Sequence, residues 1–460
     1  LRLLFFIYRA PRHFVIGKGM VKKVSPTRST VAGCAFADLM MANVMLGVHA
    51  TVMHAAPKAI IAVIADDFQI LAVGKREEVV RTLADADAAA ESAFADADLP
   101  VSAKKLNLLS SCSVATRRFI TQRPRRASVV TGAARNLGVD FTLGKTRRTG
   151  VFEDRLRKVR PKVTKIRKLL KIGVKTRRFA VSVVGSAIKY GSGVIGASNN
   201  QIRKRRAMVH GCVVRRTAGR SATLDFALSR GDPRTLDPSY FMTAAPIRDL
   251  AAALWDKWTP RNWILRPWMS CFKAVSDKNF SWNQVNDPIM AAAASARRIG
   301  WHSNKPGHLT TRDGVEISLD SVCPRSVYQL VCRDIEVHNL RNTVANDPIL
   351  RCLGPDAIPW IFPLKRLVEK KCSDNWTPLH QSFIRVVATG DLWTADRLAD
   401  CNLIDEDGSC KACGDPASVF HRCWDCPARF RYRNNYGCDN YIQAARTNFH
   451  NTKDVNRDDP

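Results

Sequence analysis

The stretch Ala59-Ile-Ile-Ala-Val-Ile-Ala-Asp66-Asp67-Phe-Gln-Ile-Leu-Ala-Val73 decides the fold of the first part of this chain. Two short apolar runs, rich in β-branched residues and bounded by Pro57 and Gly74, flank an acidic pair. This pattern predicts two strands joined by a tight turn. Adjacent carboxylates repel each other unless a cation lies between them, and Mg²⁺ takes carboxylate oxygens as ligands. The turn is therefore a candidate two-metal phosphoryl-transfer site, with an ordinary solvated Asp turn as the alternative.

The sequence on both sides of this hairpin favours the metal site. Residues 77–98 carry apolar side chains at helical spacing and predict an amphipathic helix. Residues 99–111 predict a turn, the pair Lys104-Lys105 and a further strand. Upstream, the small-residue loop 29–35 leads into a segment rich in Ala and Met that predicts another helix.

This order of elements resembles the palm domain of reverse transcriptases, most closely that of non-LTR (LINE-type) retrotransposons. The resemblance covers roughly residues 27–141, and residues 134–139 look like the Tyr-Leu-Gly-Val strand of the family. It implies that Asp66 and Asp67 are catalytic carboxylates that hold Mg²⁺ for nucleotidyl transfer. It also implies that Lys104 or Lys105 protonates the leaving pyrophosphate as a general acid.

The sequence departs from the family at three points. Ile64 replaces the aromatic residue before the acidic pair, and the upstream loop lacks the family's Gln. The first catalytic Asp is missing, because Asp38 is the only acid before residue 66 and falls inside the expected Ala/Met-rich helix. The chain also starts at Leu1 rather than Met. We therefore expect a fragment without the fingers and the first palm strand, inactive as a polymerase on its own.

Net charge is the second strong signal. The chain of 460 residues has a formal net charge of +31 and an isoelectric point near 10.0. Residues 117–220 hold 29 Lys or Arg and 3 Asp or Glu, so this segment carries nearly all of the excess. Such a segment repels itself unless counter-charge binds to it. Nucleic-acid phosphates are the expected source of that charge.

Residues 151–172 predict helical structure, which we expect Pro161 to divide into two helices. One stripe of this segment is apolar, and basic side chains cover the remaining faces. A basic amphipathic helix also suits an anionic membrane, but the stripe of Leu156, Val159, Val163, Ile166 and Leu170 has no Trp or Phe. In the family this position belongs to the thumb, which grips the template–primer duplex.

A second basic run at residues 203–206 is typical of either a further nucleic-acid contact or a nuclear import signal. The residues that we expect to contact nucleic acid are Arg155, Arg157, Lys158, Arg160, Lys162, Lys165, Arg167, Lys168, Lys171, Arg203, Lys204, Arg205 and Arg206.

Residues 221–360 are rich in Trp and contain four Asp-Pro pairs, and their charge is nearly balanced. We expect an irregular helical region in which the tryptophans belong to the core rather than to a base-stacking surface. The sequence assigns this region no function.

The C-terminal part contains a third signal, a cluster of metal-binding residue types. Cys410, Cys413, His421 and Cys426 have the spacing of a structural Cys₃His zinc site. A disulfide pair and a chance grouping of cysteines are the alternatives, and Cys423 is an alternative ligand. The segment also resembles the zinc-binding tail of non-LTR reverse transcriptases. In that family Cys-x-x-Cys-Gly precedes a His-x-x-x-Cys-Pro-like stretch, and here the second part has one extra residue.

Together these signals predict an α+β chain of five segments. They are a partial palm (1–145), a basic thumb-like segment (146–220), a mainly α-helical connection region (221–395), a zinc-knuckle-like domain (396–440) and a polar tail (441–460). The expected function is that of an RNA-directed DNA polymerase fragment, with Mg²⁺ and Zn²⁺ as cofactors. Its expected partners are an RNA template, a DNA primer or target and deoxynucleotides.

The alternatives belong to other classes of protein. One is a non-catalytic nucleic-acid-binding remnant that keeps the basic segment and the zinc knuckle, and another is a translated relic without a stable fold. The sequence has no clean apolar run of 18 residues and no convincing secretory signal. We therefore expect no membrane partner and an intracellular location, in the nucleus or the cytoplasm.

Overall fold

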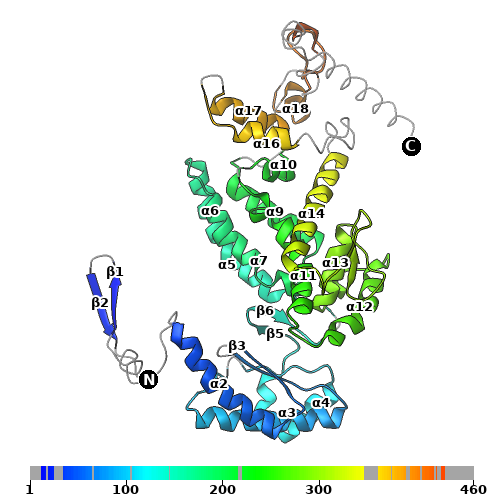
Figure 1. The fold of residues 1–460 in the computed structure, drawn as a ribbon. Helices are drawn as coiled ribbons and strands as arrows, with labels where there is room; N and C mark the ends of the chain where they lie inside the picture. Colours follow the sequence, from blue (N-terminus) through cyan, green and yellow to red (C-terminus); the bar gives the residue numbers. More distant parts are fainter. Residues whose placement is uncertain are drawn as a thin grey trace. The chain divides into compact units, whose positions relative to one another are not determined.

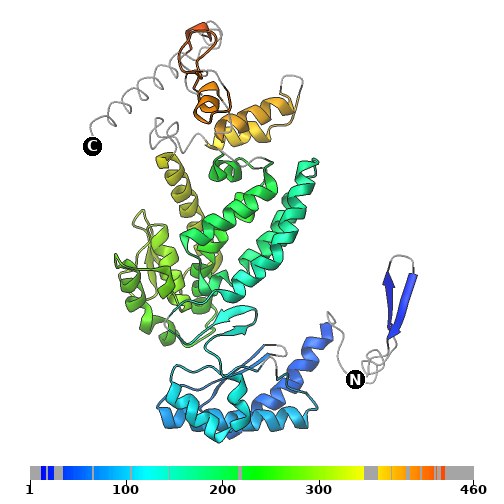
Figure 2. The same ribbon diagram turned by 180° about the vertical axis from the view of Figure 1, so that it is seen from behind.

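The computed structural model describes residues 12–16, 19–24, 35–64, 67–103, 106–144, 146–215, 220–229, 231–346, 361–373, 376–389, 394–404, 407–418, 421 and 426–429. Their contacts divide the chain into two units, residues 1–137 with 141–144 and residues 138–140 with 145–460. Helices dominate, and each described sheet has two strands (Figures 1 and 2). The expected α+β class is confirmed at this coarse level. The predicted functions of the five segments stay predictions.

The described residues of the first unit form short strands and helices. In chain order these are β1 (Arg12–Ile16), β2 (Gly19–Val24), α2 (Ala35–Ala55), β3 (Ile60–Ile64), β4 (Asp67–Leu71), α3 (Arg76–Asp96), α4 (Ser113–Gln122), the single 3-10 turn η1 (Pro124–Val129) and β5 (Ala134–Asn136). The chain passes from the first unit to the second within the β5–β6 hairpin, where β6 is Val139–Phe141.

The predicted hairpin around the acidic pair is confirmed. Strands β3 and β4 pair antiparallel, with Ile61 opposite Ile70 and Val63 opposite Phe68. Ile61, Phe68 and Ile70 pack on a core made by α2 and α3, where Val52 is fully buried. Alternate residues of a strand point to opposite faces. These three side chains therefore belong to one face of the hairpin, which the helices cover.

Helix α3 confirms the amphipathic helix expected over residues 77–98. Two other expectations for this unit are wrong. Residues 106–111 form no strand, and their pairing is limited to one bridge between Leu108 and Val130, because the chain turns at Cys112 into α4. Residues 134–139 are not one strand, since Leu137 and Gly138 both have positive φ and make a turn between β5 and β6.

The described part of the second unit consists mainly of helices. Its elements are α5 (Gly150–Lys171), α6 (Arg177–Phe179), the π-helical turn η2 (Ala180–Gly185), α7 (Ser186–Lys189), α8 (Ser192–Ile195), α9 (Asn199–Val213), α10 (Ala222–Ala227), η3 (Pro233–Thr235), α11 (Pro238–Trp255), α12 (Arg261–Ser276), η4 (Trp282–Gln284), α13 (Pro288–Arg298), β7 (His308–Thr310), β8 (Glu316–Ser318), α14 (Pro324–Asn346), α16 (Ile361–Glu369), α17 (Pro378–Ala388), α18 (Ala395–Asp400) and η7 (Pro427–Arg429).

Helix α5 corrects the expected division at Pro161, because the structure has one helix that runs through this proline. A proline inside a helix costs about 3 kcal/mol. The apolar stripe continues on both sides of it, and Leu156, Val163 and Ile166 are buried in one core with α9 and residues 180–188. Burial of the stripe on both sides of the proline offsets that cost.

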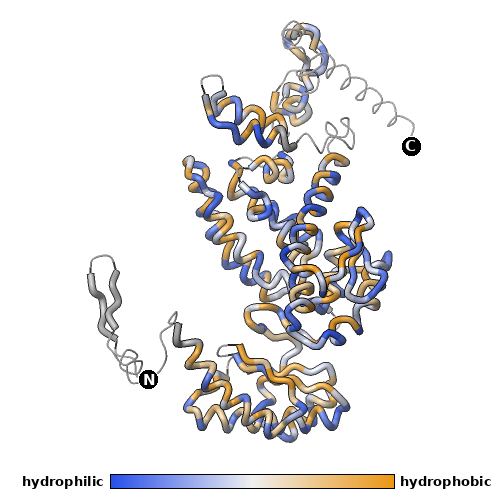
Figure 3. The backbone as a smooth tube through the Cα atoms, in the orientation of Figure 1, coloured by the Kyte–Doolittle hydropathy of each residue, from blue (hydrophilic) through white to orange (hydrophobic). Residues whose placement is uncertain are grey.

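The stripe of α5 alternates with hydrophilic positions along the helix (Figure 3). It also contains Phe152, which the sequence analysis did not include. Because this stripe is buried in the core, it is not available to a membrane surface. Among the described residues, no helix has both the length and the apolar character needed to cross a bilayer.

The Asp-Pro pairs mark helix starts. Asp232, Asp237 and Asp287 each accept a hydrogen bond from a backbone N–H of the helix that follows, at 2.8–2.9 Å. The proline after each Asp occupies the first helical position, where its missing N–H costs nothing. The fourth pair, at Asp347, lies outside the described residues.

A buried charge cluster links α9 to α10. His210 Nε2 lies 2.7 Å from Asp225 Oδ2, and Arg220 Nε donates to the same oxygen at 2.9 Å. Burial alone raises the pKa of Asp225, but the hydrogen bonds from His210 and Arg220 outweigh burial and hold this pKa below its ordinary 3.8.

This cluster predicts an acid-sensitive contribution to stability. A depressed folded-state pKa stabilises the fold above the ordinary pKa, and the contribution is lost as pH falls through the folded-state value. We expect Asp225→Asn to lower the free energy of unfolding at neutral pH by about 3–5 kcal/mol and to flatten its fall below about pH 4. Urea unfolding at a series of pH values measures both effects. Equal curves for Asp225→Asn and the exposed control Asp256→Asn would contradict the assignment.

Candidate functional site

The structure describes one of the two predicted catalytic carboxylates, Asp67, in the acidic hairpin. Asp67 begins β4 opposite Ile64, and by strand alternation it belongs to the face that the helices leave uncovered. On this face Ile64 is 49% exposed and Leu71 is 41% exposed. Asp67 itself is half-buried, so part of its side chain is open to a metal ion or substrate. Asp66, Lys104 and Lys105 lie outside the described residues.

Among the described residues, Asp67 belongs to no group of three or more metal-binding side chains, so no third carboxylate is placed beside the hairpin. Within the part of the chain that the structure describes, the one cluster of three or more His, Cys, Asp or Glu able to hold a metal ion lies near the C-terminus. Asp38 falls in α2, as expected. The Mg²⁺ site at Asp66 and Asp67 stays a prediction.

The basic face of α5 is the best-defined candidate nucleic-acid interface. Its helix spans 22 residues, which corresponds to about 33 Å at 1.5 Å per residue. No Asp or Glu occurs between Arg155 and Leu224, and the described acidic contact on this face is the exposed ion pair of Arg157 with Asp154 at 3.0 Å. Eight of the nine predicted α5 contacts are exposed: Arg157, Lys158, Arg160, Lys162, Lys165, Arg167, Lys168 and Lys171.

The ninth predicted α5 contact, Arg155, has a different role. It is half-buried, donates to the carbonyl oxygens of Tyr190 (2.7 Å) and Gly138, and stacks over the Tyr190 ring at 4.7 Å. These contacts hold the start of α5 against neighbouring backbone. Arg155 therefore has a structural role within the second unit.

The run Arg203–Arg206 in α9 also divides into two pairs. Arg205 is buried and donates to both carboxylate oxygens of Glu153 at 2.6 Å, while Arg206 forms a two-oxygen contact with Asp237 at 2.9–3.2 Å. Arg203 and Lys204 are exposed. The exposed charge here is therefore half of what the sequence indicates, which weakens the run both as a nucleic-acid contact and as an import signal.

The predicted zinc ligands come together in the structure. The candidate ligand atoms of Cys410, Cys413, His421 and Cys426 all lie within 4.8 Å of one another. Cys426 Sγ lies 3.9 Å from the Sγ atoms of Cys410 and Cys413, and Cys413 Sγ lies 3.1 Å from His421 Nε2. Tetrahedral zinc with Zn–S bonds of about 2.3 Å separates two sulfur ligands by about 3.8 Å. These residues therefore fit a closed Cys₃His zinc site.

The backbone around the cluster explains why this local sequence folds as a knuckle. Cys410 N–H donates to the Asp415 carbonyl at 2.6 Å, and Gly414 N–H donates to the Cys410 carbonyl at 2.8 Å. Gly414 has φ +82°, which favours glycine. Gly408 has φ +75°, and a Cβ there would lie 2.7 Å from Asp396 Cα, so glycine is required for this turn to approach α18.

One thiol of the cluster favours the form that binds a metal ion. The backbone N–H of Ala412, together with His421 and the neighbouring thiols, lowers the pKa of Cys410 to about 6, whereas burial, Cys410 and Cys426 raise the pKa of Cys413. A lower pKa favours the thiolate, which is the form that binds zinc. His421 presents Nε2 to the thiols, while its Nδ1 lies 3.9 Å from Asp415 Oδ2. A carboxylate on this side orients the ring. Cys423 lies outside the described residues.

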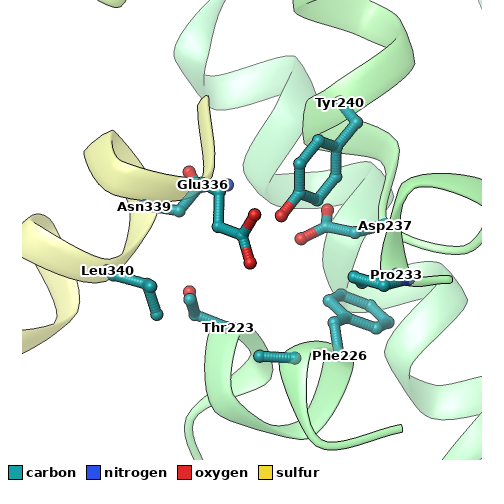
Figure 4. A pocket seen from close by; sticks show the side chains of 9 residues that line it. Thr223, Phe226, Pro233, Asp237, Tyr240, Glu336, Asn339 and Leu340 are labelled. Atoms are coloured by element: carbon teal, nitrogen blue, oxygen red, sulfur yellow. The ribbon is translucent and has the colours of Figure 1, made fainter. Parts of the chain in front are cut away.

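A pocket in the second unit is too small to hold a ligand (Figure 4). Its wall includes the acids Asp237 and Glu336, and burial raises the pKa of Glu336. Asp237 already contacts Arg206 and caps α11, so it is structural. Its cavity volume of about 10 Å³ has room for no more than about one water molecule, so no small-molecule ligand fits there.

Three exposed tryptophans were missed by the sequence analysis. Trp268 and Trp301 lie in the core as expected, but Trp255, Trp258 and Trp263 do not. The close spacing of these three residues, with basic neighbours among them, is the sequence feature that indicates exposure. The balanced charge averaged over residues 221–360 does not reveal this local cluster.

Comparison with known proteins gives no assignment. No protein-family model, no curated protein and no solved structure matches this chain.

Proposed function

We propose that this chain is a nucleic-acid-binding part of an RNA-directed DNA polymerase of the non-LTR retrotransposon type. The observation that carries the proposal is the β3–β4 hairpin, whose connection contains Asp66 and whose second strand begins at Asp67. Helices α2 and α3 pack on one of its faces, and the other face is uncovered. This arrangement supports a polymerase palm, where substrate must approach the carboxylates from the open side.

The proposed chemistry assigns a role to each predicted group. Asp66 and Asp67 would hold Mg²⁺, which activates the primer 3′-hydroxyl and stabilises the leaving pyrophosphate. Lys104 or Lys105 would protonate that leaving group. The exposed face of α5 would hold the template–primer duplex through its phosphates, which need charge rather than base readout. Zinc would stabilise the C-terminal knuckle and take no part in the reaction. The protein would act inside the cell.

Metal-directed cleavage tests the proposal without requiring a complete active site. Fe²⁺ replaces Mg²⁺ in the presence of an RNA–DNA template–primer, and peroxide then generates radicals that cut nucleic acid beside the bound ion. We expect cuts at the primer 3′ end, because the carboxylates place the ion there. The variant Asp66→Asn/Asp67→Asn should lose these cuts and still bind the duplex.

The matched control, Asp85→Asn/Asp96→Asn, removes the same charge from exposed positions on α3 and should keep the cuts. Bound duplex without 3′-end cuts in the unaltered chain would contradict the metal site. RNA-templated primer extension with Mg²⁺ is measured on the same samples. Extension that only Asp66→Asn/Asp67→Asn abolishes would show that a third ligand exists within the chain.

The second candidate function is non-catalytic nucleic-acid binding. The observation that favours it is the exposed basic face of α5, which needs no carboxylate to operate. In that case duplex binding is tight and salt-sensitive, and the Asp66→Asn/Asp67→Asn variant behaves as the unaltered chain in every assay.

A further inference from the structure

Three tryptophans within nine residues are exposed at one turn of the second unit. Trp255 is 44% exposed, Trp258 is 65% exposed and Trp263 is 52% exposed. Each indole left in water forgoes a large burial gain, since an aromatic side chain buries about 150–250 Å². By contrast, Trp268 on α12 is fully buried and donates its indole N–H to Ser303 Oγ at 2.7 Å. The exposed set is therefore separate from the core aromatics.

The turn that carries these tryptophans has a defined backbone. It connects α11 to α12 (Figure 1). Trp258 N–H donates to the Ala253 carbonyl at 3.1 Å, and Trp263 N–H donates to the Pro260 carbonyl at 2.9 Å. Lys257 adopts φ +54°, a left-handed backbone conformation that is unfavourable for residues other than glycine. The hydrogen bonds hold this conformation, so the indoles extend from a fixed turn.

Basic residues accompany the three indoles along the chain. Lys257, Arg261 and Arg266 lie within or beside the turn, against the single acid Asp256. Arg261 forms an ion pair with Asp320. Lys257 and Arg266 are exposed, and no ion pair is described for either within the mapped part of the chain. Lys257 directly precedes Trp258, and Arg266 follows Trp263 by three residues on α12, a spacing that places two side chains on the same helix face.

Aromatic faces next to free cations are the means by which proteins hold unpaired nucleic acid. Bases stack on the rings without sequence preference, and the cations contact the phosphates between them. A membrane or a protein partner would also use tryptophan, but neither requires the planar π face itself. The exposed cations Lys257 and Arg266, which belong to this stretch of the chain, favour the polyanion.

We propose that the turn from Trp255 to Trp263 binds unpaired bases of single-stranded RNA by stacking. This inference relies on the proposed function for the identity of the partner, but the site is different from the α5 face. Duplex phosphates contact α5, whereas an unpaired stretch of the same RNA contacts the tryptophan turn.

The test compares two triple variants of Trp255, Trp258 and Trp263. The Leu variant keeps apolar volume and removes the π faces, whereas the Phe variant keeps a stacking ring. The probes are a 15-nucleotide single-stranded oligoadenylate and a 15-base-pair RNA duplex. We expect the Leu variant to lose on the order of 100-fold in affinity for the single strand, with duplex affinity unchanged. The Phe variant should keep most of the single-strand affinity.

Intrinsic fluorescence gives an independent readout. Base stacking quenches indole emission, so the single strand should quench the unaltered chain and not the Leu variant. Equal single-strand affinity of the unaltered chain and the Leu variant would overturn the proposal. Equal losses for Leu and Phe would also overturn it, because stacking distinguishes them. Binding to phosphatidylserine vesicles in preference to the oligonucleotide would assign the turn to a membrane instead.

The same probes separate this inference from the proposed function. Binding of the duplex without the single strand would reject the tryptophan site alone. Binding of neither probe would reject both proposals. Far-UV circular dichroism of each variant should match that of the unaltered chain, because all three positions are exposed.

Discussion

Removing zinc should unfold the C-terminal knuckle while leaving the helical core of the second unit intact. The knuckle has few buried apolar residues, of which Ala417 and Cys426 are described, so metal binding must supply most of its stability. A structural zinc site contributes about 10–16 kcal/mol in small zinc-binding peptides. We expect one zinc ion per chain by elemental analysis. Chelation should then make amide exchange fast at residues 407–418 and leave α11 and α14 protected.

Cysteine variants provide the control for zinc binding. Cys413→Ser removes a ligand thiolate and should lower the zinc content to a small fraction of one per chain. Cys401→Ser changes an exposed cysteine outside the cluster and should retain the metal. Equal zinc content in both variants, or no zinc in the unaltered chain expressed with zinc present, would contradict the assignment. A disulfide in place of the metal would appear as a loss of reactive thiols.

Neutralising the α5 face should weaken duplex binding more than any comparable change elsewhere. The variant replaces Arg160, Lys162, Lys165 and Lys168 by Gln, which is a good helix former. Each phosphate contact contributes a slope of about −0.9 in log affinity against log salt. Loss of four contacts should make the slope shallower by about 3.6 and lower the affinity on the order of 10³-fold at about 0.15 M salt.

The matched control removes four exposed basic residues from other elements. They are Lys273, Lys278, Arg325 and Lys371. Both variants have the same net charge, so a general electrostatic effect would lower the affinity of both equally. Fluorescence anisotropy over a series of salt concentrations measures affinity and slope together. Equal slopes for the two variants would show that α5 is not the interface.

The sequence alone correctly predicted features that depend on residues close together in the chain. The β3–β4 hairpin follows from two apolar runs and a turn. The helix over α3 follows from apolar spacing, and the cysteine and histidine spacing brought the four candidate zinc ligands together. Short segments determine these features because their contacts form between neighbouring residues.

Contacts between distant residues decided the rest, and the sequence pattern does not contain them. The sequence pattern indicates that Arg205 and Arg206 are exposed charges. Folding instead pairs them with Glu153 and Asp237. Pro161 reads as a helix boundary until burial on both sides of it holds α5 continuous. The sequence pattern assigns the tryptophans to one core. Packing buries Trp268 and leaves Trp255, Trp258 and Trp263 exposed.

The sequence by itself determined which chemical groups this protein has and which short segments form the acidic hairpin, helix α3 and the metal-ligand cluster. It set the acidic turn, the excess of basic residues and the metal-ligand spacing. The tertiary structure alone decided which charges remain exposed to meet a phosphate and which are neutralised inside the fold. The physical reason is that an ion pair or a buried ring depends on partners far away in the chain, and only packing brings those partners within reach.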